Sequence, residues 1–134
     1  MNELNEKICE MVSSCHFCKK VAPFEMRKEN NDFFVQCGLC NEVLPITKEA
    51  AENWIPMCKQ LPDNKTSLLL YKRFVDDLTN NIATIKANNI NPKTFIGNLV
   101  SALEKEGYSE TGVNFISNIF MEEIRKGSFN YLFI

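Results

Sequence analysis

The chain has 134 residues, of which 45% are hydrophobic and 24% are charged, and its formal net charge is −2. These proportions are typical of a globular protein with one domain or two very small ones, and they exclude a disordered tail. The longest apolar run near a helical pattern, Leu68 to Tyr71, is far shorter than the roughly 18–20 residues that span a bilayer. The N-terminus also lacks the apolar core of a signal peptide, so we expect a protein that stays in the cytoplasm.

The first segment has apolar residues at helical spacing. Leu4, Ile8, Met11 and Val12 recur in this way, which predicts a short amphipathic helix over Asn2 to Ser14. That helix would lead directly into the first of two cysteine pairs.

Four cysteines dominate the first half of the chain. Cys15 and Cys18 enclose two residues, as do Cys37 and Cys40, and eighteen residues separate the pairs. Four thiolates on two tight turns make the tetrahedral arrangement of a structural Zn²⁺ site. We therefore predict one structural zinc ion in a zinc ribbon, and we take the other two cysteines, Cys9 and Cys58, as small buried apolar residues.

The residues between the cysteine pairs have the pattern of a hairpin. Segments Phe24 to Lys28 and Phe33 to Gln36 flank the turn-forming run Asn30-Asn31-Asp32, and Val43 to Ile46 would close a small sheet. Gly38, inside the second pair, is expected to adopt positive φ.

A helix is predicted from Lys48 to Ile55, with Thr47 as its N-cap. Pro56 should kink or end it, because proline lacks the N–H that a helix interior needs. Trp54, the only tryptophan, is expected to pack in the core over the metal turns rather than to form a ligand-binding platform.

No catalytic residues emerge from the sequence. His16, the only histidine, has no nucleophile partner nearby, and four thiolates already fill a tetrahedral zinc site. Nucleotide-binding and metalloprotease motifs are absent from the chain as well. We therefore predict that the protein is not an enzyme.

The ribbon carries little positive charge for binding nucleic acid. Between Cys15 and Cys58, five basic residues face six acidic ones, and a zinc ion with four thiolates adds about −2. Phosphate binding needs clustered Lys and Arg, so the doublets Lys19-Lys20 and Arg27-Lys28 are more simply a solvated surface than a nucleic-acid site.

Over about residues 13–58, the predicted ribbon resembles the Lar-type restriction-alleviation zinc ribbons of phages and prophages. The matching positions are Cys15, Phe17, Cys18, Val35, Cys37, Cys40, Glu49, Ala50, Glu52 and Trp54. His16 and Ile55 depart from the proline and asparagine usual in that family. The resemblance implies a small phage protein, acting in the host-cell cytosol, that contacts host defence machinery.

The second half of the chain is predicted to be helical. Leu61 to Asn64 would be a linker, with Thr66 or Ser67 as the next N-cap. Apolar residues from Leu68 to Ile85 then alternate steps of three and four, which predicts a helix over Ser67 to Ala87. We favour packing within one chain, and a homodimer through this helix stays an alternative. The residues of its apolar seam are Leu68, Tyr71, Val75, Leu78, Ile82 and Ile85, with Leu69, Leu70 and Phe74 widening it.

Two further helices follow. Pro92 suits the first position of one helix, and Gly107 would end it. The other begins at Ser109 or Thr111 and ends at Gly127. Three helices with short connections can bury a shared core.

The C-terminal tail is unusually apolar. Its large apolar residues are Phe129, Tyr131, Leu132, Phe133 and Ile134. They either pack back onto the protein or form a docking segment for a partner.

Together these features predict an α+β protein: a four-cysteine zinc ribbon with an N-terminal helix over residues 1–60, and a domain of about three helices over 61–134. Our first hypothesis for its function is a phage-type adaptor or inhibitor that binds a host protein, in counter-defence against a restriction or CRISPR-type system. The alternative is a transcription regulator, or a nucleic-acid module contacting RNA polymerase or DNA.

Overall fold

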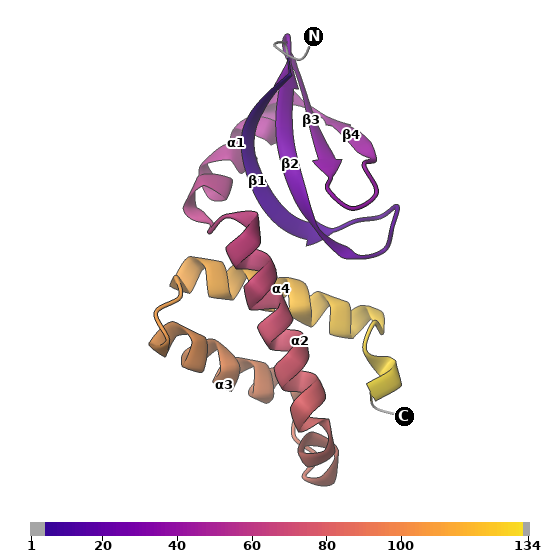
Figure 1. Ribbon diagram of the computed structural model, residues 1–134, viewed down its shortest axis with the longest axis vertical. Coiled ribbons are helices and arrows are strands. Elements are labelled where there is room, and N and C mark those ends of the chain that lie inside the picture. The colour runs from indigo at the N-terminus through magenta and orange to yellow at the C-terminus, as the bar shows by residue number, and fades with distance from the viewer. Residues whose placement is uncertain (1–4, 133–134) are drawn as a thin grey trace. The chain divides into compact units, whose positions relative to one another are not determined.

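The computed structural model describes residues 5–132, in which a four-stranded antiparallel sheet is followed by four α-helices (Figure 1). This order confirms the predicted α+β class, with the four cysteines in the sheet-containing half. The elements are β1 (Asn5–Ser14), β2 (Val21–Glu29), β3 (Asp32–Cys37), β4 (Val43–Ile46), α1 (Lys48–Gln60), α2 (Asn64–Ala87), α3 (Pro92–Lys105), α4 (Glu110–Lys126) and a 3₁₀ turn, η1 (Asn130–Leu132).

The chain divides into two compact units, and the division falls between Leu68 and Leu69. It therefore lies inside α2, whereas the predicted boundary followed residue 60. The first unit contains the sheet, α1 and the first turn of α2, and the second contains the rest of α2 with α3 and α4.

The prediction of a helix near the N-terminus is wrong, because Asn5 to Ser14 form strand β1. β1 pairs antiparallel with β2 along nearly its whole length, and this long partner outweighs a local helical pattern. The register shifts between Lys7 and Cys9, which marks a bulge at Ile8. A bulge interrupts the strict alternation of side chains, so the strand pattern was hard to recognise in the sequence.

The sheet has the strand order β1-β2-β3-β4, and its register sets which side chains share a face (Figure 1). Met11 lies opposite Phe24, Cys9 opposite Met26, and Met26 opposite Val35. These side chains therefore project from the same face. The predicted hairpin is confirmed, and Asn30 has a φ of 56° in its turn.

Helix α1 packs against β1 and β3 and is longer than predicted. The hydroxyl of Thr47 accepts a hydrogen bond from the backbone N–H of Ala50 at 3.1 Å, which confirms the predicted N-cap. Pro56 does not end the helix, which continues to Gln60. Ala51 and Cys58 are buried by this packing.

Helix α2 contributes Leu70, Phe74 and Leu78 to the second unit, and all three are fully buried. Leu78 belongs to the predicted seam, and Leu70 and Phe74 were predicted to widen it, whereas the seam residues Leu68 and Val75 are only half-buried. The side chain of Asp63 accepts a hydrogen bond from the N–H of Thr66 at 2.8 Å, so α2 begins earlier than predicted. In the described part of the chain, neither α2 nor any other helix is long and apolar enough to cross a membrane.

Helices α3 and α4 pack together and complete the core of the second unit. The side chains of Asn91 and Ser109 cap their N-termini, and Gly127 closes α4 with a φ of 91°. The ring of Phe120 on α4 lies 5.4 Å from the ring of Phe74, centroid to centroid. Apolar packing of this kind stabilises the three predicted helices as one unit.

The apolar tail is divided between the core and the surface. Phe129 is buried, with its ring 5.1 Å from that of Phe120, so its side chain is not available to a partner. Tyr131 is 65% exposed and Leu132 is half-buried. Phe133 and Ile134 lie outside the described residues.

Candidate metal centre

The two cysteine pairs lie on turns that repeat the same hydrogen bonds. The residue after each pair donates its N–H to the carbonyl of the first cysteine: Lys19 to Cys15, and Asn41 to Cys37, both at 3.0 Å. Both closing residues have positive φ, 61° for Lys19 and 64° for Asn41. The same backbone geometry at both sites brings the two thiols of each pair to one side of their turn.

Gly38 does not adopt the positive φ that was predicted for it; among the described glycines, positive φ is found at Gly107 and Gly127. Instead, its N–H donates a hydrogen bond to the carbonyl of Pro23 at 2.7 Å. A Cβ at this position would lie 2.9 Å from the same oxygen, closer than real Cβ atoms approach. Glycine is therefore needed here because the second cysteine turn sits directly against β2.

The four predicted ligands converge on one point. The sulfur atoms of Cys15, Cys18, Cys37 and Cys40 all lie within 4.8 Å of one another, with 3.7 Å between Cys15 and Cys40 and 4.0 Å between Cys18 and Cys37. A tetrahedral ion with metal–sulfur bonds of about 2.3 Å holds its sulfur ligands about 3.8 Å apart. The site can therefore hold a metal ion without rearrangement of the cysteines.

The electrostatics of the cluster also favour a cation. Burial, together with the thiols of Cys15 and Cys37, raises the pKa of Cys18. The N–H of Glu42 lowers the pKa of Cys40, but burial together with the other three thiols outweighs it and raises that pKa to about 12. By contrast, the N–H groups of Cys18 and Phe17 lower the pKa of Cys15 to about 7, against the effect of burial. Four thiolates can coexist here only if a bound cation compensates their charge.

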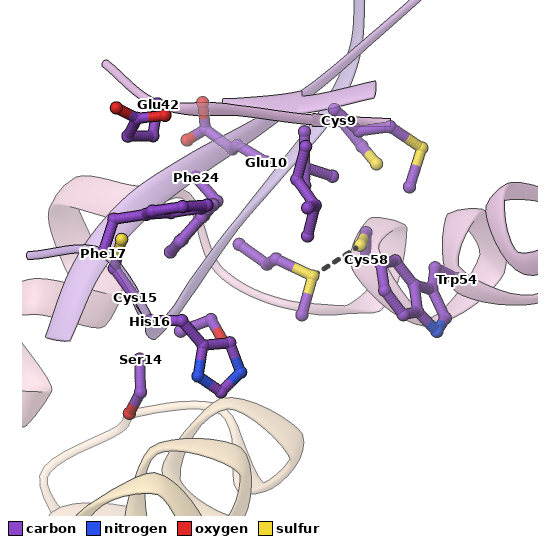
Figure 2. Close-up of a pocket in the computed structure, with 15 residues that line it drawn as sticks. Cys9, Glu10, Ser14, Cys15, His16, Phe17, Phe24, Glu42, Trp54 and Cys58 are labelled. Atoms are coloured by element: carbon purple, nitrogen blue, oxygen red, sulfur yellow. Dashed lines mark hydrogen bonds between the residues drawn. The ribbon is translucent and has the colours of Figure 1, made fainter. Parts of the chain in front are cut away.

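A cavity beside the metal centre was not anticipated from the sequence. It has a volume of about 270 Å³ and is lined by the first cysteine turn, the apolar face of the sheet and α1 (Figure 2). Trp54 lines it and is 39% exposed, so the prediction that this residue is part of the core is wrong. Trp54 and Cys58 are four residues apart on α1, a spacing that places both on the side of the cavity.

His16 is exposed and lines the same cavity. The cluster of potential metal ligands within the described residues consists of the four cysteines and does not include it. Its ring lies at the edge of the group drawn in Figure 2.

Large apolar side chains are exposed on the cysteine turns themselves. Phe17 lies between the cysteines of the first turn and is 56% exposed, and Leu39 lies between those of the second and is 54% exposed. Val43 and Leu44, just after the second turn, are 48% and 46% exposed. The metal centre thus displays apolar side chains to solvent from both of its turns.

Comparisons of the chain with protein-family models, with curated proteins and with solved structures give no match.

Proposed function

We propose that the ion held by the four cysteines is Zn²⁺ and that its role is structural. Four thiolates complete the tetrahedral coordination that zinc prefers, and they leave no open position for water or substrate. The ion would join two turns that are separated by eighteen residues of the chain, which suits a small sheet with few buried side chains of its own.

The protein is then an adaptor or inhibitor that binds another protein. The observation that carries this proposal is the exposure of Phe17 and Leu39, because the shared ion holds both side chains in fixed positions on one small structure. Exposed large apolar side chains gathered in one region are typical of protein-binding surfaces. With the resemblance to Lar-type ribbons, this supports a phage-type protein that binds a host protein in counter-defence.

The charges favour a protein partner over nucleic acid. Arg27 hydrogen-bonds to the carboxylate of Glu25 at 3.1 Å, and Lys28 lies over the ring of Phe33, 5.5 Å from its centre. One of the two basic doublets is therefore engaged within the sheet. Clustered basic side chains that remain available to phosphates are what nucleic-acid binding requires.

The test is an affinity pull-down from a nuclease-treated bacterial host lysate, washed at low and at high salt. We expect a discrete host protein to be retained in high salt, because apolar contacts are less salt-sensitive than phosphate contacts. The double variant Phe17→Ser, Leu39→Ser should lose it. Leu69→Ser, which alters an equally exposed side chain on α2, is the matched control and should retain it.

Two outcomes would contradict the proposal. Recovery of nucleic acid or RNA polymerase subunits would favour the alternative, a transcription regulator. Equal retention of the partner by the double variant and by the wild-type protein would exclude the cysteine turns as the binding surface.

A further inference from the structure

A second group of sulfur atoms lies in the first unit, apart from the four clustered cysteines. The Sγ of Cys58 lies 3.4 Å from the Sδ of Met11, a contact between α1 and β1 that is drawn as a dashed line in Figure 2. Two residues before Met11 on the same face of the sheet, Cys9 lies opposite Met26. All four side chains line the cavity beside α1.

The two cysteines of this group are close enough to influence each other. Burial and the neighbouring Cys9 thiol raise the pKa of Cys58 to about 12. Cys58 is buried and Cys9 is half-buried. At neutral pH the Cys58 thiol is therefore protonated, and it stays so unless a strongly bound cation replaces the proton.

These donors are all soft. Soft sulfur ligands suit copper(I) and zinc, but zinc sites rarely use thioethers, so a site that mixes thiolates with thioethers favours copper(I), and magnesium and calcium require oxygen. Two thiols with one or two thioethers match the low coordination number of a monovalent soft ion. The cavity provides space beside the sulfurs, and the partly exposed Trp54 and Leu44 on its lining show that it opens to solvent.

We propose that Cys9, Cys58 and Met11 bind one copper(I) ion, in a site separate from the four-cysteine centre. On binding, both thiols lose their protons to solvent and form two copper–sulfur bonds, and the Met11 thioether adds a third, neutral donor. The copper stays in the +1 state, and no electron is transferred. Met26 lies beside Cys9 as a further thioether on the wall of the site.

The test uses the full-length protein loaded with zinc and titrated with copper(I) without oxygen, in the presence of a competing copper(I) chelator. Zinc and copper per chain are measured by mass spectrometry of the elements, and fluorescence of Trp54 reports on the cavity. We expect the first equivalent of copper to bind with zinc fully retained and with a change in Trp54 fluorescence.

Single substitutions assign the site. Cys9→Ser and Cys58→Ser should each abolish uptake of the first equivalent while zinc content stays unchanged. Met11→Leu should weaken copper binding by at least about tenfold, because loss of even an outer partner of a metal ligand commonly costs that much. Met57→Leu is the matched control, because this methionine is exposed and does not line the cavity, and it should bind copper as the wild-type protein does.

Two results would overturn the proposal. One is release of zinc by the first equivalent of copper in the wild-type protein, which would place copper in the four-cysteine centre. The other is uptake of that equivalent by Cys9→Ser with undiminished affinity. Cys58 is buried, so Cys58→Ser could prove too unstable to test. In that case Cys9→Ser tests the proposal by itself, because Cys9 is only half-buried.

Discussion

At the scale of single residues, Glu10 links the sheet to the start of α2 within the first unit. Its carboxylate accepts a hydrogen bond from the N–H of Asn64 at 2.6 Å and forms an ion pair with Lys7. The side chain of Asn64 in turn donates to the carbonyl of Phe24 at 3.1 Å. The N–H of Asn64, followed by Lys7, lowers the pKa of Glu10 below its ordinary value of 4.5.

Glu10→Gln is therefore expected to lower the free energy of unfolding at pH 7 by about 1 kcal/mol, since a bond to a charged acceptor is replaced by a weaker neutral one. Because folding lowers this pKa, the carboxylate stabilises the protein above pH 4.5, and that stabilisation is lost as pH falls through the folded pKa. Denaturant titrations of both proteins across this range measure the difference. It should shrink toward zero in acid.

Glu29→Gln is the matched control, because Glu29 is an exposed carboxylate on the neighbouring strand. It should change stability little at any pH. A deficit in Glu10→Gln that stays constant into strong acid would show that the cause is packing and not charge.

Some residues could be assigned from the sequence and others could not, for a physical reason. The four cysteines were identified because each pair of ligands is local, two residues apart on one turn. The role of Gly38 depends on Pro23, fifteen positions earlier, and no local pattern indicates that contact. The partial exposure of Trp54 likewise depends on a cavity formed by three separate elements.

At the scale of elements, the helices of the second unit were predicted well because their end signals are local. Asn91 and Ser109 begin α3 and α4, and Gly127 ends α4 at a residue with left-handed conformation. β1 was missed because its strand conformation depends on pairing with β2. The ten residues of β1 carry no local pattern that indicates this partner.

Two glycines of the helical unit should respond in opposite ways to the same substitution. Gly97 lies inside α3 with no atom within 4 Å of an added Cβ, so Gly97→Ala should stabilise the unit by about 0.5–1 kcal/mol. Gly127 has a φ of 91°, and an added Cβ would lie 2.8 Å from the side-chain amide of Asn130. Gly127→Ala should therefore destabilise it by about 1 kcal/mol or more.

Thermal unfolding followed by far-UV circular dichroism measures both changes. Each variant serves as the control for the other, because the added methyl group is the same. Shifts of the same sign in both variants would contradict the assigned backbone conformations.

At the scale of the whole molecule, the two units are stabilised differently. The first has a cluster of four cysteines that can hold a metal ion beside a small sheet, and the second has a continuous core that includes Leu70, Phe74 and Phe120. The sequence predicted this contrast from the spacing of the two cysteine pairs and from the helical periodicity of the second half. The division inside α2 could not be predicted, because the apolar pattern of that helix runs without a break across Leu68 and Leu69.

Removal of the metal should consequently unfold one unit and spare the other. In Cys37→Ser, or after treatment with a strong chelator, the first unit should unfold, because binding of a structural zinc ion contributes on the order of 10 kcal/mol to folding. Fluorescence of Trp54, the only tryptophan, reports on the first unit, and circular dichroism is dominated by the helices. We expect a large change in fluorescence with most of the helical signal retained.

Cys9→Ser is the control for this experiment, since it makes the same exchange outside the four-cysteine cluster and should keep its zinc. Loss of the helical signal together with the fluorescence change would show that the second unit cannot fold without the first. Unchanged zinc content in Cys37→Ser would mean that this cysteine is not a ligand.

The order of the elements along the chain has a consequence for how the protein is made. All four cysteines of the metal centre lie before the division at Leu68, so a ribosome completes them before it adds α3 and α4. Domains synthesised first generally fold first. If the first unit needs the proposed metal in order to fold, we expect the cell's supply of metal at the moment of translation to decide whether this unit folds or exposes its strands while the helices are still being added.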